Sequence, residues 1–142
     1  RADWLVWVVV VVVRGTETSG WVWAGRVYVL AMDPVGQDRL AVEASGVTPD
    51  FASVSKLRLS RDVFREGLRL YPPVPMMVRE TRCPEDMRGR AAPIGAQVVL
   101  SPWHLHRHER LWDNPDGFDP TRWGTENGKQ CQRDAYIPFS AG

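Results

Sequence analysis

The stretch Glu66-Gly67-Leu68-Arg69-Leu70-Tyr71-Pro72-Pro73 carries the clearest structural signal in the sequence. Glu66 and Arg69 lie three residues apart, so on a helix their carboxylate and guanidinium groups share one face. Pro72 ends such a helix, because proline disfavours helical geometry in the residue before it. Taken alone, the pair predicts a solvent-exposed contact that stabilises the helix by about 0.3 kcal/mol.

The residues around this pair predict a helix over residues 60–71. Ser60 can act as the cap that accepts a hydrogen bond from the first turn. Phe64, Leu68 and Tyr71 then follow at i, i+4 and i+7, a spacing that gathers them on one side of a helix. Glu66 and its partner therefore lie on the face opposite this apolar stripe.

The composition is that of an ordinary folded domain, with 142 residues, 44% of them hydrophobic and 25% charged. The 18 basic and 17 acidic residues nearly cancel, so we expect no nucleic acid or anionic lipid as a partner. Cys83 and Cys131 lie far apart, which predicts neither a disulfide framework nor a thiolate zinc site. This cysteine usage is typical of the reducing cytoplasm.

Residues 4–32 fit two different structures. The valine run and the alternation around Trp21-Val22-Trp23 favour strands, with residues 14–20 as the turn of a β-hairpin. Residues 21–32 also fit a helix, in which each Val costs about 0.5 kcal/mol relative to Ala, a cost that burial can offset. The apolar run at residues 4–13 is shorter than the roughly 20 residues of a bilayer span. We therefore expect no membrane segment here, and the charges beside the run favour a buried core element over a signal peptide.

A second helix is predicted over residues 34–45. Asp33 is a good N-cap, and a proline at residue 34 suits the first helical turn, where its missing N–H is not needed. Gly46 predicts the end of the helix.

The second half of the chain predicts a small sheet followed by a loop. Residues 74–100 form the sheet, from short strands at residues 74–78 and 97–100. Residues 107–142 are rich in Asn, Asp, Gly and Pro, so we expect a long ordered loop, the kind of segment that usually serves a site. Its aromatic anchors are Trp112, Phe118 and Trp123.

Two motifs follow the Glu66 and Arg69 pair along the chain. Leu70-Tyr71-Pro72-Pro73-Val74-Pro75 comes at once, and Phe118-Asp119-Pro120-Thr121-Arg122-Trp123 comes later. Together these residues resemble cytochrome P-450, a family of haem-thiolate monooxygenases. In that family the Glu-x-x-Arg pair and the arginine of the later motif form a buried triad, so the resemblance implies a triad of Glu66, Arg69 and Arg122. Two guanidinium groups that both bind one buried carboxylate would hold the helix to a distant loop.

Gly15-Thr16-Glu17-Thr18 resembles the oxygen-activating groove in the long central helix of the family. The resemblance implies a helix over residues 4–32, and this replaces the hairpin prediction. It also implies catalytic roles: splitting dioxygen takes two protons, relayed through the Thr18 hydroxyl and water, with Glu17 as their source. Without the resemblance these residues predict an ordinary polar turn. Arg14 departs from the family, which usually has Ala or Gly there, and it puts a long cation near the expected haem face.

The segment after the triad helix is similar to the strand that lines the family's substrate pocket. The implied pocket residues are Val74, Met76, Met77 and Val78. Arg79 stands where many members have an arginine that pairs with a haem propionate, and a guanidinium fork suits a carboxylate. From the residues alone, the apolar side chains fit core packing as well, and Arg79 fits an ordinary surface arginine.

Ile137-Pro138-Phe139-Ser140-Ala141-Gly142 resembles the opening of the family's haem loop, Phe-x-x-Gly-x-Arg-x-Cys. The resemblance implies that Pro138, Phe139 and Gly142 bind the cofactor. It also implies that the cysteine that binds the iron lies beyond Gly142. Neither Cys83 nor Cys131 matches that position, so we expect no metal ligand within these residues and an isolated chain that is inactive.

The motifs together imply a mainly α fold with a small β-sheet, in which residues 1–142 form a single partial domain. The implied activity of the parent protein is the insertion of one oxygen atom of O2 into a small organic substrate. That activity uses haem, and it uses electrons from NAD(P)H that arrive through a flavoprotein or a ferredoxin.

Two other functions fit the residues. The first is a non-catalytic fragment or scaffold without haem. The second is a small metal-binding protein built on His104, His106 and His108, which would face one side if they formed a strand. No carboxylate or thiol at a useful spacing completes that set, and the family has a similar His-Arg segment in a structural position. We therefore favour a structural role for the three histidines.

Overall fold

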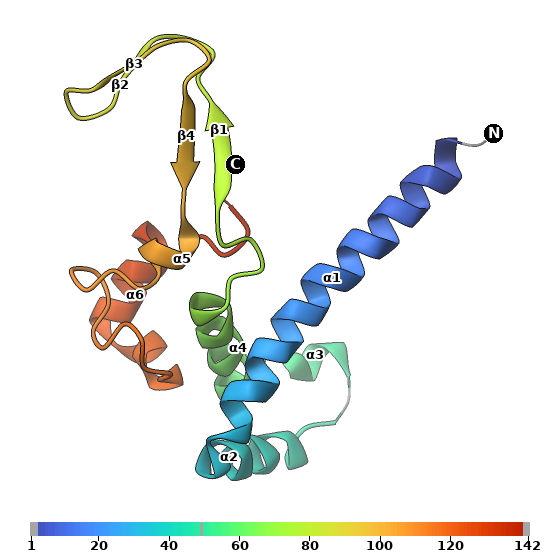
Figure 1. The fold of residues 1–142 in the computed structure, drawn as a ribbon. Helices are drawn as coiled ribbons and strands as arrows, with labels where there is room; N and C mark the ends of the chain where they lie inside the picture. Colours follow the sequence, from blue (N-terminus) through green and yellow to red (C-terminus); the bar gives the residue numbers. More distant parts are fainter. Residues whose placement is uncertain (1–2, 49, 141–142) are drawn as a thin grey trace.

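The computed structural model describes residues 3–48 and 50–140, and for residues 3–14 and 18 it describes the backbone alone. Within these residues the chain is mainly helical with two small antiparallel sheets, which confirms the predicted fold class (Figure 1). The helices are α1 (Asp3–Ala31), α2 (Pro34–Ser45), α3 (Phe51–Val54), α4 (Arg58–Leu70), α5 (Pro102–Leu105), the 3-10 helix η1 (Pro120–Gly124) and α6 (Glu126–Asp134). The strands are β1 (Met77–Glu80), β2 (Glu85–Asp86), β3 (Ala91–Ala92) and β4 (Gln97–Leu100).

The long helix α1 shows that the hairpin predicted from local β propensity is wrong. Its 29 residues form one unbroken helix that runs past α4 and ends at α2 (Figure 1). In its second half Val29 is buried, and a Cβ on Gly25 would lie 3.0 Å from the Tyr71 ring, while Trp21, Trp23, Val27 and Tyr28 are exposed. Contacts of this helix with α4 and α2 accompany the helical structure, for which each Val costs only about 0.5 kcal/mol. Within the described part of the chain, no helix is long and apolar enough to cross a membrane.

Arg26 is a cation buried between α1 and α4. Its side chain is 4% exposed, and its guanidinium carbon lies 3.5 Å from the centre of the Phe64 ring. It donates hydrogen bonds to the carbonyl oxygens of Val22 and Phe64, at 2.6 and 3.0 Å. Burial lowers the pKa of Arg26 to about 10. Its stem also fills the space beside Gly67, where a Cβ would lie 2.8 Å from Arg26 Cγ, so this arginine joins the two helices.

The start and end of α2 agree with the cap prediction. Asp33 accepts a hydrogen bond from the Gly36 backbone N–H at 2.9 Å, and a proline occupies the first turn. Gly46 is the C-cap with a φ of −86°, so the helix ends there without a left-handed residue.

The start of α4 corrects the prediction that Ser60 caps it. The helix begins at Arg58, and its N-cap residue makes no capping bond through its side chain. Glu43, from α2, supplies the cap: its carboxylate accepts bonds from the backbone N–H groups of Leu59 and Ser60, both at 2.8 Å. The Ser60 hydroxyl also donates to Glu43, at 2.7 Å. A side chain 16 residues away therefore satisfies the free N–H groups of the first turn.

The sheet is split in two, and its first strand begins later than predicted. β1 pairs antiparallel with β4, from Met77 opposite Leu100 to Glu80 opposite Gln97, and β2 pairs with β3 as a separate hairpin. The predicted strand at residues 74–78 is therefore correct only from Met77 onward. Pro75 has no N–H with which to join a ladder, which explains the later start.

The loop predicted for residues 107–142 contains helical structure that the sequence reading missed. In α6, Thr125 caps the helix by accepting a bond from the Gly128 N–H at 3.0 Å. This helix and η1 enclose the hydrophobic cluster of the region. Its buried members are Trp112, Trp123, Cys131 and Ala135. Two of the three predicted aromatic anchors thus belong to a real core.

The contact between α6 and η1 leaves no room at Gly128. A Cβ there would overlap the carbonyl oxygen of Arg122, whereas a Cβ on Gly124 would meet nothing within 4 Å. We expect Gly128→Ala to lower the free energy of unfolding by about 1–3 kcal/mol, because the backbone must shift to relieve the overlap. Urea unfolding measures this change. Gly124→Ala is the matched control and should change it by less than about 0.5 kcal/mol; equal effects would contradict the packing described.

Candidate functional site

The structure brings Glu66, Arg69 and Arg122 together in a buried network. Glu66 Oε1 accepts bonds from Arg69 Nη2 at 2.8 Å and from Arg122 Nε at 2.9 Å. It also accepts one from the Asp119 backbone N–H at 3.0 Å, and Oε2 accepts from Arg69 Nε at 3.0 Å. Glu66 and Arg69 are 0% exposed and Arg122 is 5% exposed. One carboxylate therefore holds two guanidinium groups out of water.

The remaining N–H groups of the two arginines bind the loop between α5 and η1. Arg69 Nη2 donates to the Gly117 carbonyl at 2.9 Å, and Arg122 Nη2 donates to the same carbonyl at 3.1 Å. Arg122 Nη2 also donates to the Asn114 carbonyl at 3.0 Å. These carbonyl dipoles offset the second positive charge, which a single carboxylate cannot neutralise. The network thereby fixes this loop to α4.

His106 extends the network to the segment that leads to Phe139. Its Nδ1 lies 3.1 Å from the Arg69 carbonyl oxygen, and its Nε2 accepts a bond from the Ile137 N–H at 2.9 Å. The side chain is 0% exposed, and its ring stacks on Tyr136 with centres 5.4 Å apart. Burial lowers the pKa of His106 to about 4, so the imidazole is neutral at pH 7. The sequence predicted a structural role for this histidine but did not indicate these hydrogen-bond partners.

The neutral state of His106 makes stability depend on pH. Its pKa falls from 6.5 to about 4 on folding, so as the pH drops the unfolded chain binds a proton first. The stability that the group contributes is complete above pH 6.5 and is lost as the pH falls to about 4, by at most about 3 kcal/mol. The free energies of unfolding of wild type and His106→Gln, measured with urea, should therefore differ less at about pH 4 than at about pH 7. A difference that stays constant with pH would contradict this account.

A second group of predicted residues meets at β1. Arg79 donates a hydrogen bond from Nη2 to Ser140 Oγ at 2.9 Å, joining positions 61 residues apart. In Figure 1 the last segment of the chain passes beside β1. None of the six ion pairs found among the described residues involves Arg79, and its side chain is exposed. Its guanidinium therefore remains available for a carboxylate of a ligand.

Phe139 directly precedes Ser140, the partner of Arg79, and lies across a pocket from α1. Its side chain is 59% exposed, whereas Pro138 is buried. A pocket of about 230 Å³ separates Phe139 from α1 and α4; it is lined by Ser19, Val22, Trp23, Phe64 and Phe139. Glu17, on the same helix, is exposed. The Thr18 side chain and Gly142 lie outside the described residues, so their predicted roles stay predictions.

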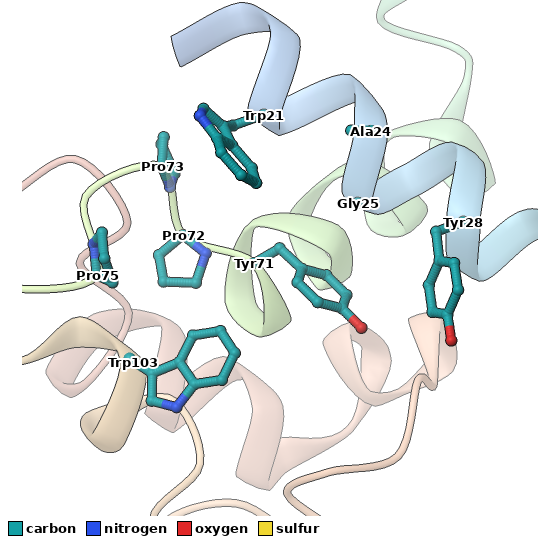
Figure 2. A pocket seen from close by; sticks show the side chains of 9 residues that line it. All are labelled: Trp21, Ala24, Gly25, Tyr28, Tyr71, Pro72, Pro73, Pro75 and Trp103. Carbon is teal, nitrogen blue, oxygen red and sulfur yellow. The ribbon is translucent and has the colours of Figure 1, made fainter. Parts of the chain in front are cut away.

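The four predicted pocket residues differ in burial. Met77 is buried at 8% exposure, Val74 is half-buried, and Met76 and Val78 are 60% and 55% exposed. None of them lines the larger cavity of about 620 Å³ nearby, which lies between α1, the prolines after α4 and α5 (Figure 2). That cavity is lined by Trp21, Ala24, Gly25, Tyr28, Tyr71, Pro72, Pro73, Pro75 and Trp103. The substrate-facing role of Val74 to Val78 therefore remains a proposal.

Neither cysteine is placed to bind a metal at this site. Cys131 Sγ donates to the Leu111 carbonyl at 2.9 Å within the hydrophobic cluster, and burial raises its pKa. Cys83 Sγ donates to Glu85 at 3.2 Å on the surface. Both are free thiols. Both thiols are thus engaged in hydrogen bonds with protein oxygen atoms.

The strand geometry assumed for the histidine-based metal site is absent. Residues 102–105 form α5, and a turn follows, so alternate residues do not share one face. His106 is buried with both ring nitrogens bonded, while His104 and His108 are exposed. Among the residues that the structure describes, no group of three or more His, Cys, Asp or Glu side chains could hold a metal ion.

The structure thus combines a buried Glu-Arg-Arg network, the loop that this network holds, and a contact between β1 and the segment around Phe139. The family model for cytochrome P-450 matches residues 2–142. The chain therefore belongs to the cytochrome P-450 family.

Relatives from bacteria and mammals support this assignment. Cyclooctatin synthase of Streptomyces melanosporofaciens is 34% identical over 143 residues, which covers 95% of this chain and 30% of that protein. Cyclooctat-9-en-7-ol 5-monooxygenase of the same organism is 34% identical over 139 residues, with the same coverage. Cytochrome P-450 4X1 of Mus musculus is 35% identical over 142 residues, covering 89% of this chain and 28% of that protein. The chain thus spans about 30% of the length of the first of these relatives.

Proposed function

We propose that the chain is a segment of a haem-thiolate monooxygenase that inserts one oxygen atom of O2 into an organic substrate. The reaction consumes the substrate, O2, two electrons and two protons, and it yields the oxygenated product and water. One relative is named as a 5-monooxygenase, which supports this reaction class. The observation that carries the proposal is the hydrogen bond between Arg79 and Ser140, because it unites the propionate-binding and haem-loop positions of the family.

The cofactor in this proposal is haem, which supplies the activation of dioxygen. Arg79 would bind a propionate through its guanidinium fork, which has no carboxylate partner among the described residues. Pro138, Phe139 and Gly142 would form the start of the loop around the cofactor. The exposed ring of Phe139 suits contact with an apolar macrocycle.

The residues proposed for proton transfer and the residues proposed to line the substrate pocket lie in different parts of the chain. Glu17 and Thr18 on α1 would carry protons toward dioxygen, and the exposed Glu17 carboxylate can exchange its proton with water. Val74, Met76, Met77 and Val78 would line the space for the substrate, where flexible methionines suit ligands of varied shape.

Electrons would come from NAD(P)H through a flavoprotein or a ferredoxin. A cytoplasmic location is a further proposal, and it rests on the two unpaired cysteines. The isolated chain would be inactive, because neither of its cysteines is placed at the haem loop.

The coding sequence after Gly142 tests the proposal. The family loop predicts an arginine at the second residue and a cysteine at the fourth residue after Gly142. Finding both would support the monooxygenase. A stop codon at that point, or another residue in place of the cysteine, would contradict it and favour the scaffold without haem.

A further inference from the structure

His106 connects two segments that both belong to the candidate site. Its ring lies between the C-terminal end of α4 and the Ile137 backbone, which directly precedes Pro138 and Phe139. Tyr136 stacks on one face of the ring, and Trp112 meets it edge-on with centres 6.4 Å apart. The imidazole is therefore held from several sides, and water does not reach it.

The hydrogen bonds of His106 determine which nitrogen carries its proton. The Ile137 N–H is a donor, so Nε2 must be the acceptor and the proton sits on Nδ1. Nδ1–H then donates to the carbonyl of Arg69, one of the helix-end carbonyls that lack a partner within α4. In return, Arg69 Nη1 donates to the His106 carbonyl at 2.8 Å. Arg69 and His106 thus bind each other's backbone.

The charged neighbours of His106 also favour a neutral ring. Arg69 and Arg107 both lie close enough to disfavour an imidazolium. A doubly protonated ring would also have no lone pair for the Ile137 N–H. The bridge from α4 to Ile137 therefore requires the neutral ring with its proton on Nδ1.

We propose that His106 is a positioning residue, which places the Ile137–Phe139 segment relative to α4 by accepting the Ile137 N–H at Nε2 and donating from Nδ1 to Arg69. The claim that this places the haem loop rests on the proposed function. The bridge itself does not depend on it.

The variants His106→Gln and His106→Asn test the two hydrogen bonds of the His106 ring separately. In His106→Gln the side-chain oxygen can reach the Nε2 position and still accept from Ile137, whereas in His106→Asn the amide mimics Nδ1 and leaves Ile137 without an acceptor. We expect amide hydrogen exchange at Ile137 to accelerate by about tenfold or more in His106→Asn, and to stay within about threefold of wild type in His106→Gln. The amide of Ala135, bonded to the Cys131 carbonyl in α6, is the internal control and should not change.

Equal exchange at Ile137 in wild type and His106→Asn would overturn the proposal. If His106→Asn does not fold, the nitrogen-15 chemical shifts of the wild-type imidazole test the proposal instead, because they distinguish the two tautomers. A proton on Nδ1 supports the bridge, and a proton on Nε2 overturns it.

Haem occupancy of the full-length protein tests whether His106 also positions the haem loop. We expect His106→Asn to lower haem occupancy and His106→Gln to preserve it, with His104→Asn as the exposed-histidine control. Equal occupancy in His106→Asn and His106→Gln would overturn the link to the loop. A wild-type protein that binds no haem would instead contradict the proposed function, and the exchange and tautomer results would still test the bridge.

Discussion

Glu66→Gln should destabilise the chain by about 3–5 kcal/mol, a large part of the stability of any single domain. The substitution keeps the size of the side chain but removes its charge. Two buried guanidinium groups then have no carboxylate, and Oε1 loses the charge that attracts Arg69, Arg122 and the Asp119 N–H. The free energy of unfolding from urea titration at neutral pH measures the loss.

Asp62→Asn is the matched control for this prediction. Asp62 lies one turn earlier on α4 and pairs with Arg65 at 3.5 Å, but both side chains are partly exposed. Its replacement should change the free energy of unfolding by less than about 1 kcal/mol. Similar losses for Glu66→Gln and Asp62→Asn would mean that the triad is no more important than a surface ion pair.

Trp112→Ala should cost about 3–5 kcal/mol as well. Trp112 is 1% exposed, and its ring meets Trp123 edge-on with centres 5.8 Å apart. Its Nε1 donates to the Leu105 carbonyl at 3.1 Å, so the substitution leaves a cavity and removes a buried donor. Thermal and urea unfolding should both show the loss.

Trp23→Ala removes the same side chain from an exposed position and serves as the control. Trp23 is 64% exposed on α1 and buries far less surface than Trp112, so we expect a change below about 0.5 kcal/mol. A loss for Trp112→Ala as small as that of the control would show that the cluster around η1 and α6 is not a packed core.

The resemblance to cytochrome P-450 made the triad predictable, because its motifs named all three members. The spacing of Glu66 and Arg69 alone predicted a solvent-exposed pair, and that prediction is wrong, since both side chains are 0% exposed. The partners of the triad were not predictable in this way. Nothing in the sequence indicates that Arg69 and Arg122 share the Gly117 carbonyl, since that depends on the path of the loop. The partners of His106 were not predictable either, because its hydrogen bond to Ile137 joins positions 31 residues apart.

Local propensity failed where tertiary contacts decide the structure. The valines and tryptophans of α1 favour strands by themselves, but the helix packs on α4 and Tyr71. The start of α4 was misplaced because its cap, Glu43, comes from another helix. In α6 a local signal was present and overlooked: Thr125 as cap, Glu126 in the first turn and Arg133 in the last turn.

The reduced carbon monoxide spectrum of the full-length protein tests the central claim most directly. A haem with a thiolate ligand gives a red-shifted Soret band in this state, and a haem with a histidine ligand does not. We predict the red-shifted band for a protein that contains this chain. A haem protein with an unshifted band, or a protein that binds no haem, would contradict it.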